Sequence, residues 1–213
     1  MWLTVFLIEN VRNFCEASWQ KKSLKVIIIS SIEEDQRSAK MRKLVIIIHP
    51  DMENSVVNRM WKNALISEQV DVVDLYELYP DRNIDVAREQ ERLMSYDTIV
   101  FQFPLYWYSS PPLLKQYQDE VFLFNFAYGP EGTKLRDKKF AIATTVGSLE
   151  EDYSEEGSNR FTLDTLLSPF VATFNYIGAQ YKGHFEQYGT VNHATKNELI
   201  EGSKRYIEFV KKL

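Results

Sequence analysis

Short apolar segments alternate with amphipathic segments throughout residues 41–213. Residues 44–48 form a continuous apolar, β-branched run, which is typical of a strand covered by helices on both faces. The predicted strands are residues 44–48, 70–75, 98–103, 140–145 and 179–185. Apolar positions three and four apart predict helices between them, over residues 55–67, 84–94, 163–176 and 197–210.

One further helix should begin at Pro111, because Ser110 can cap it and proline suits a first helical turn. Pro169 should kink or divide the helix over residues 163–176, since proline lacks a backbone N–H. Strands that alternate with helices predict an α/β domain, with a mostly parallel sheet between two helical layers. Five strands suit the order 2-1-3-4-5.

The first forty residues do not continue this alternation. Residues 30–37 are polar and unpatterned, and Met41 stands just before the first predicted strand. We expect residues 1–40 to be an N-terminal extension outside the domain of residues 41–213, arising from a start site assigned too early. The alternative is that residues 24–29 add an edge strand. The apolar opening lacks the flanks of a signal peptide.

Composition argues against several classes of function. The net charge of -5 disfavours nucleic acid as a partner, since phosphate binding needs concentrated Lys and Arg. The lack of an apolar run of ~18 residues argues against a membrane-spanning segment. Cys15 is the single cysteine, so we expect neither an intrachain disulfide nor a cysteine metal site, and a reducing cytoplasmic setting fits.

Ligands of open parallel sheets bind beyond the carboxyl ends of the strands, where the strand order reverses. After the first strand, His49 begins a loop that leads into a helix, and a helix N-terminus can hold a phosphate. Ser55 and Asn58 would add a hydroxyl and an amide donor. The alternative is that Asn54 or Ser55 simply caps the helix.

After the third strand, Tyr106, Trp107 and Tyr108 follow Pro104 and Leu105. Three successive aromatic residues cannot all face inward on a turn, so they offer an apolar wall for a flat cofactor such as an isoalloxazine ring. The alternative is an aromatic cluster that anchors the loop or forms an oligomer contact.

After the fourth strand, the segment Thr144-Thr145-Val146-Gly147-Ser148 precedes Tyr153. Small side chains there would let the backbone approach a ligand closely. The alternative is an ordinary turn between a strand and a loop.

The segment Phe101-Gln102-Phe103-Pro104-Leu105-Tyr106-Trp107-Tyr108-Ser109-Ser110-Pro111-Pro112-Leu113-Leu114-Lys115 resembles the flavin loop of the NAD(P)H:quinone oxidoreductase family. This flavodoxin-like family includes DT-diaphorase, the ancillary flavoproteins of potassium-efflux systems and general stress protein 14. The resemblance covers residues 43–213. Within this range, the other similar segments are His49-Pro50, Asp74-Leu75-Tyr76, Phe126-Ala127-Tyr128-Gly129-Pro130 and Asn159-Arg160-Phe161-Thr162.

The resemblance implies a flavodoxin-like three-layer sandwich and a two-electron reduction of quinones or similar acceptors. It implies a flavin cofactor and NAD(P)H as electron donor. We expect FMN, with FAD possible, because residues 41–213 form a compact chain without an evident adenosine-binding addition. The resemblance further implies a cytoplasmic homodimer, or one peripheral to the inner face of the membrane. The alternatives are a regulatory subunit that binds a membrane transport partner in a potassium-efflux system, a flavodoxin-type electron carrier, and a flavin-free interaction module.

The resemblance also assigns residues to the site. The flavin phosphate would lie at Ser55, Val57 and Asn58, with His49 nearby. The isoalloxazine ring would be lined by Pro104, Leu105, Tyr106, Trp107 and Tyr108, and its other edge by Thr144, Thr145, Gly147 and Tyr153. Tyr153 and Tyr128 are the expected catalytic residues, the first as a proton-relay tyrosine and the second in the acceptor pocket against a neighbouring subunit.

The chain departs from the family pattern in two places. Val146 replaces a glycine, and because a β-branched residue resists positive φ, we expect that turn to differ. The family's relay histidine falls near Ser158–Asn159, where this chain has none. We expect His184 and His193 to be capping or surface groups.

Overall fold

The computed structural model describes residues 41–191 and 194–213, so the predicted N-terminal extension and His193 lie outside the described residues. The five expected strands form one parallel sheet in the order β2-β1-β3-β4-β5, as predicted. Their bounds are β1 Lys43–Ile47, β2 Asp71–Asp74, β3 Thr98–Pro104, β4 Lys139–Thr145 and β5 Gln180–Gln187.

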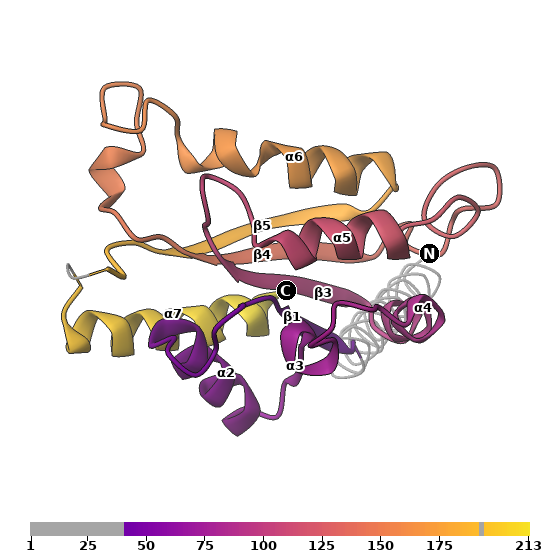
Figure 1. Cartoon of the computed structure of the whole chain (residues 1–213), viewed down its shortest axis with the longest axis horizontal. Helices are drawn as coiled ribbons and strands as arrows, with labels where there is room; N and C mark the ends of the chain where they lie inside the picture. The colour runs from indigo at the N-terminus through magenta and orange to yellow at the C-terminus, as the bar shows by residue number, and fades with distance from the viewer. Residues whose placement is uncertain (1–40, 192–193) are drawn as a thin grey trace, which may run out of the picture. The chain divides into compact units, whose positions relative to one another are not determined.

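The helices cover both faces of this sheet, which confirms the predicted three-layer arrangement (Figure 1). Their bounds are α2 Val57–Ser67, α3 Leu75–Leu78, α4 Val86–Met94, α5 Pro112–Val121, α6 Leu163–Tyr176 and α7 Lys196–Lys212, and the 3-10 turn η1 is Glu150–Asp152. Side chains of α2 and α7 share one buried cluster with β1, whereas α3, α4, α5 and α6 contribute to a second. None of the described helices is long and apolar enough to cross a membrane.

The end of β2 and the start of α5 differ from the positions predicted from the sequence. The second strand ends at Asp74 rather than Leu75, because the Asp74 side chain accepts a hydrogen bond from the Glu77 N–H and so caps α3. Ser110 does not cap α5: Pro111 occupies the N-cap position, without a side-chain hydrogen bond among the described residues, and Pro112 begins the helix.

Pro169 does not divide α6, which is assigned as one helix from Leu163 to Tyr176. A proline at this position leaves the carbonyl four residues earlier without its usual backbone donor. That carbonyl belongs to Thr165, and it accepts a hydrogen bond from the Ser168 hydroxyl at 2.7 Å. A local side-chain donor thus replaces the missing N–H and accommodates the proline.

Candidate functional site

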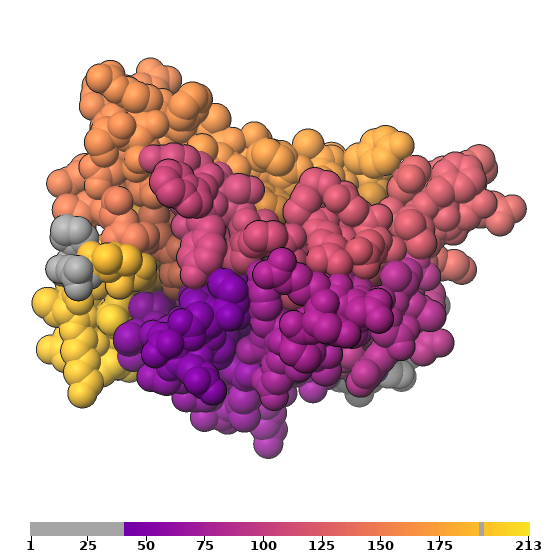
Figure 2. Space-filling view, viewed as in Figure 1, coloured from indigo at the N-terminus to yellow at the C-terminus, as the bar shows by residue number. Residues whose placement is uncertain are grey.

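The parallel sheet brings the loops after β1, β3 and β4 together at its carboxyl edge. Pro104 pairs with Thr145 at the ends of β3 and β4, and the Leu105 N–H donates to the Thr145 carbonyl at 2.9 Å. The rings of His49 and Tyr106 are 6.4 Å apart, which joins the loops after β1 and β3. The segments after β1 (indigo), β3 (magenta) and β4 (orange) are neighbours on the surface (Figure 2). The candidate site lies where these loops meet.

The aromatic residues after β3 form a tight two-residue hairpin turn. Tyr106 and Ser109 exchange backbone hydrogen bonds of 2.8 and 3.0 Å, while Trp107 and Tyr108 have φ values of 46° and 62°. Positive φ at both central residues defines a type I′ turn, which normally carries Asn and Gly. Here it carries two aromatic residues, and Trp107 is 93% exposed. The turn therefore presents a large ring to solvent at some conformational cost, as binding sites often do.

The helix after β1 begins without a side-chain cap. Neither Asn54 nor Ser55 caps it: Val56 is the N-cap residue, with no side-chain hydrogen bond in the described part of the chain, and the Asn54 amide bonds Asp51 instead. The first helical bond runs from the Met60 N–H to the Val56 carbonyl. The preceding N–H groups of the first turn have no intrahelical partners, and within the part of the chain that the structure describes they are open to an anion.

The Asn58 side chain is buried beneath this helix end rather than exposed at it. Its amide nitrogen lies 3.0 Å from the Thr145 hydroxyl, and its amide oxygen lies 3.2 Å from the Gln102 amide nitrogen. The Gln102 amide oxygen in turn accepts from the Tyr206 hydroxyl at 3.0 Å. Sequence reasoning missed Gln102 and Tyr206. The available signal was a polar residue at the centre of a strand predicted to be buried on both faces.

The turn after β4 needs no positive φ, although Val146 replaces a glycine of the family pattern. Neither Val146 nor Gly147 is among the described residues with positive φ. The Val146 side chain is buried, and its backbone bonds the Gln187 carbonyl and the Thr190 N–H. Valine is therefore compatible with this turn. Just before it, Thr144 is fully buried, and its hydroxyl has no partner among the described residues.

Two tyrosines connect the aromatic turn to the loop after β4. The Tyr108 hydroxyl donates to the Asn159 amide oxygen at 3.0 Å. Tyr153 follows η1 and packs on Tyr188, with ring centroids 5.7 Å apart. Partial burial raises the pKa of Tyr153, and the neighbouring Tyr108 and Asp152 raise it further. Tyr153 therefore keeps its proton at neutral pH. Asn159 and Tyr188 were not predicted as site residues.

His49 is buried at the start of the loop after β1. Its Nδ1 accepts the Asp51 N–H at 3.1 Å, which places the ring proton on Nε2. Burial lowers the pKa of His49, and this outweighs the opposing charges of Asp51 and Asp74. The ring is therefore neutral at physiological pH and contributes no positive charge to the site.

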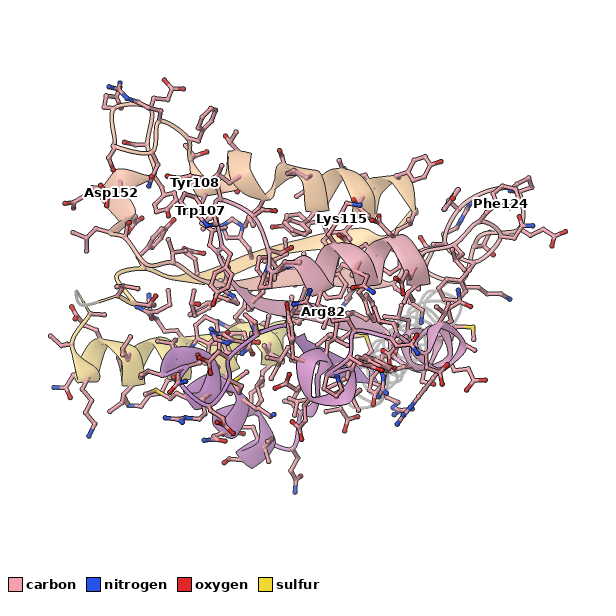
Figure 3. All side chains as sticks on the ribbon, viewed as in Figure 1. Arg82, Trp107, Tyr108, Lys115, Phe124 and Asp152 are labelled. Carbon is pink, nitrogen blue, oxygen red and sulfur yellow. The ribbon has the colours of Figure 1, made fainter. Side chains whose placement is uncertain are left out.

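Tyr128 is the one predicted site residue that the fold does not bring to this place. It follows α5, which runs from the carboxyl edge of the sheet back toward the opposite edge, about 15 Å over its ten residues. The Tyr128 ring packs on Phe124 and Tyr176 at 5.8 and 5.7 Å. Trp107, Tyr108 and Asp152 lie at one end of the domain and Phe124 at the other (Figure 3). Tyr128 thus belongs to a separate aromatic patch.

Comparisons with known proteins agree on one family. The model of a family described as "flavodoxin-like fold" matches residues 41–210. A Bacillus subtilis (strain 168) protein named uncharacterized NAD(P)H oxidoreductase YdeQ is 46% identical over 171 residues, which cover 80% of this chain and 86% of the relative.

Solved structures resemble the chain in the same way. A general stress protein 14 from Treponema denticola, in complex with FMN, is 34% identical with a TM-score of 0.77, covering 80% of this chain and 98% of the other. An NADPH-quinone reductase from P. pentosaceus is 27% identical with a TM-score of 0.68, covering 78% and 97%. This chain therefore belongs to the flavodoxin-like NAD(P)H oxidoreductase family.

Proposed function

We propose that this chain is an FMN-dependent NAD(P)H oxidoreductase that reduces quinones or similar small acceptors by two-electron transfer. The observation that carries the proposal is the exposed aromatic turn of Tyr106, Trp107 and Tyr108, which stands beside an uncapped helix end. The names of the relatives support the oxidoreductase class, and the FMN complex and the NADPH-quinone reductase support the cofactor and the acceptor.

The phosphate end of FMN fits the start of α2. The backbone N–H groups of Val57 and Asn58 have no partner there among residues 41–191 and 194–213, and the partly buried Ser55 stands just before them. A helix N-terminus binds phosphate through such N–H groups and its partial positive charge, so a cluster of lysines is not required. The phosphate would thus be held by backbone rather than by cationic side chains.

The ring end of FMN fits the space beside the loops after β3 and β4. Tyr106, Trp107 and Tyr108 would cover one side and exclude water, while Pro104 and Leu105 would form the floor. Thr145 would supply a hydroxyl at the end of β4, and Gly147 allows close backbone approach. The Thr144 hydroxyl is fully buried in the protein, so Thr144 would border the site without offering this hydroxyl to the cofactor.

When bound, FMN would supply the redox chemistry, a two-electron transfer between NAD(P)H and the acceptor. The protein would position the donor and the acceptor against the ring. Tyr153 holds a proton on its hydroxyl at neutral pH, as an ordinary tyrosine does, and burial raises its pKa further. We propose that it donates this proton as a hydrogen bond to an oxygen of the bound acceptor, which stabilises developing negative charge.

A second subunit would complete the acceptor pocket. Tyr128 lies at the far end of its own domain, so it can reach a flavin only in another subunit. Phe124 and Tyr176, 60% and 71% exposed, flank Tyr128. Exposed aromatic patches of this kind are typical of interaction surfaces. We therefore propose a homodimer in which Tyr128 of each subunit lines the site of its partner.

The test is a visible spectrum of the purified chain incubated with FMN and separated from free cofactor. The proposal predicts a yellow protein that NADPH or NADH bleaches under anaerobic conditions and that a quinone then restores. A protein that stays colourless would contradict the proposal. A yellow protein that dithionite bleaches and nicotinamide nucleotides do not would instead support an electron carrier.

A further inference from the structure

A chain of buried hydrogen bonds runs along one face of the sheet, the face covered by α2 and α7, from α7 to the candidate site. It runs from the Tyr206 hydroxyl to the Gln102 amide and on to the Asn58 amide, and it ends at the Thr145 hydroxyl. Its members come from α7, β3, α2 and β4, so only the folded domain assembles it. Every member is buried, and Asn58 is only 1% exposed.

Gln102 fixes the donor-to-acceptor direction of this chain of hydrogen bonds. The Gln102 amide nitrogen lies 3.2 Å from the backbone carbonyl of Asn58, and a carbonyl can only accept. The amino end of Gln102 must therefore face Asn58, and its oxygen must face Tyr206. The Tyr206 hydroxyl accordingly donates to Gln102, and full burial raises the pKa of Tyr206, so this donor is not lost at any working pH.

The same donor-to-acceptor direction continues to Thr145, where the chain of hydrogen bonds ends. The Asn58 amide oxygen accepts from Gln102, so its amino group must face Thr145 and donate to the Thr145 hydroxyl. Because the Thr145 oxygen accepts this bond, its own hydrogen points away from Asn58. No hydrogen bond among residues 41–191 and 194–213 uses the Thr145 hydroxyl as a donor.

We propose that Gln102, held by Tyr206, is a positioning residue that keeps the Thr145 hydroxyl as an outward hydrogen-bond donor to an acceptor oxygen of the bound flavin. Without Gln102, the Asn58 amide can rotate and accept from Thr145, which withdraws the donor from the ligand. This inference rests on the proposed function, and it assigns a role to residues that need not contact the cofactor.

The test is a double-mutant cycle on FMN affinity, measured from flavin fluorescence in the apoprotein. Gln102→Met and Tyr206→Phe are each made alone and together with Thr145→Val. One net hydrogen bond corresponds to roughly 2- to 13-fold in dissociation constant. We expect Gln102→Met and Tyr206→Phe each to weaken binding within this range, with the larger effect for Gln102→Met. Each double variant should bind no more weakly than Thr145→Val alone.

The non-additivity separates positioning from general destabilisation, which would weaken FMN binding equally in the wild-type and Thr145→Val backgrounds. Tyr117→Phe is the matched control, because it removes a buried hydroxyl that bonds Glu89 in the other core cluster. It should leave FMN affinity unchanged. Effects that multiply with Thr145→Val would overturn the proposal, as would unchanged affinity in both Gln102→Met and Tyr206→Phe. A wild-type chain that binds no FMN would overturn the proposed function and this inference together.

Discussion

The Tyr108 hydroxyl donates a hydrogen bond of 3.0 Å to the amide oxygen of Asn159, 51 residues further along the chain. This bond connects the aromatic turn after β3 to the loop after β4. Both segments border the candidate site, so one contact links two sides of it. Both groups lie near the surface, where a net hydrogen bond contributes about 0.5–1.5 kcal/mol.

Tyr108→Phe should loosen the loop after β4 without unfolding the domain. Amide hydrogen exchange of residues 149–160 should become faster by up to about tenfold, as the loss of one hydrogen bond allows. The melting temperature of the apoprotein should stay nearly constant. Exchange as slow as in the wild-type chain would show that other contacts hold the two loops together.

Trp107→Ala should release the flavin while sparing the fold. Trp107 is 93% exposed in the free protein, so its loss should change the free energy of unfolding by no more than about 0.5 kcal/mol. Flavin affinity should fall at least about tenfold, because a ring that stacks on the cofactor is lost. Measured flavin retention and turnover equal to those of the wild-type chain would contradict the assignment of this turn.

Trp107→Gly is a matched comparison for Trp107→Ala. Glycine adopts positive φ at no steric cost, whereas the φ of 46° at Trp107 strains both tryptophan and alanine. The glycine variant should therefore melt a few degrees higher than the alanine variant, since about 1 kcal/mol corresponds to roughly 2–4 °C at this size. Both should lose flavin alike. Equal melting temperatures would argue that the turn carries no conformational strain.

Acidification should destabilise the apoprotein through His49. Burial lowers the pKa of His49 in the folded state, so the unfolded chain binds its proton more readily. Stability should then fall as the pH drops below about 6.5, and the loss should end once the pH passes the lower folded pKa. Urea unfolding at pH 7 and pH 5 measures this loss. His49→Asn keeps an acceptor for the Asp51 N–H and should show a smaller loss; an identical loss would exclude His49 as its source.

The aromatic patch at the far end of the domain should control dimer formation. Phe124→Asp places a charge beside Tyr128 and Tyr176, and light scattering should report a monomer for this variant and the proposed dimer for the wild-type chain. Ile66→Asp, at a residue that is 53% exposed on α2, serves as the control and should remain dimeric. A Phe124→Asp variant that stays dimeric would place the interface elsewhere.

Much of this fold was predictable because β1, β3 and β4 carry runs of apolar residues, as strands covered on both faces do. Every predicted strand end lies within two residues of the observed end, and the order 2-1-3-4-5 followed from five strands that alternate with helices. Helix starts were harder, because a residue that can cap does not always do so: Asp74 caps α3, whereas Ser55 leaves α2 uncapped. Such choices depend on the local backbone and not on residue type alone.

Individual residues of the candidate site could be predicted from the sequence, but the contacts between them could not. The aromatic turn was evident in the sequence, since Trp107 and its neighbours cannot all be buried. The hydrogen bond of Tyr108 with Asn159 and the hydrogen-bond chain from Tyr206 to Thr145 join residues that are 44 to 104 positions apart. Contacts at such separations depend on the assembled sheet and helices, and a single sequence carries no direct signal of them.

A crystal structure of this chain grown with FMN tests the central claim most directly. The account predicts the isoalloxazine ring against the turn of Tyr106, Trp107 and Tyr108, with the phosphate at the N-terminal end of α2. Aromatic side chains of this turn folded inward, with FMN bound elsewhere or not at all, would contradict it.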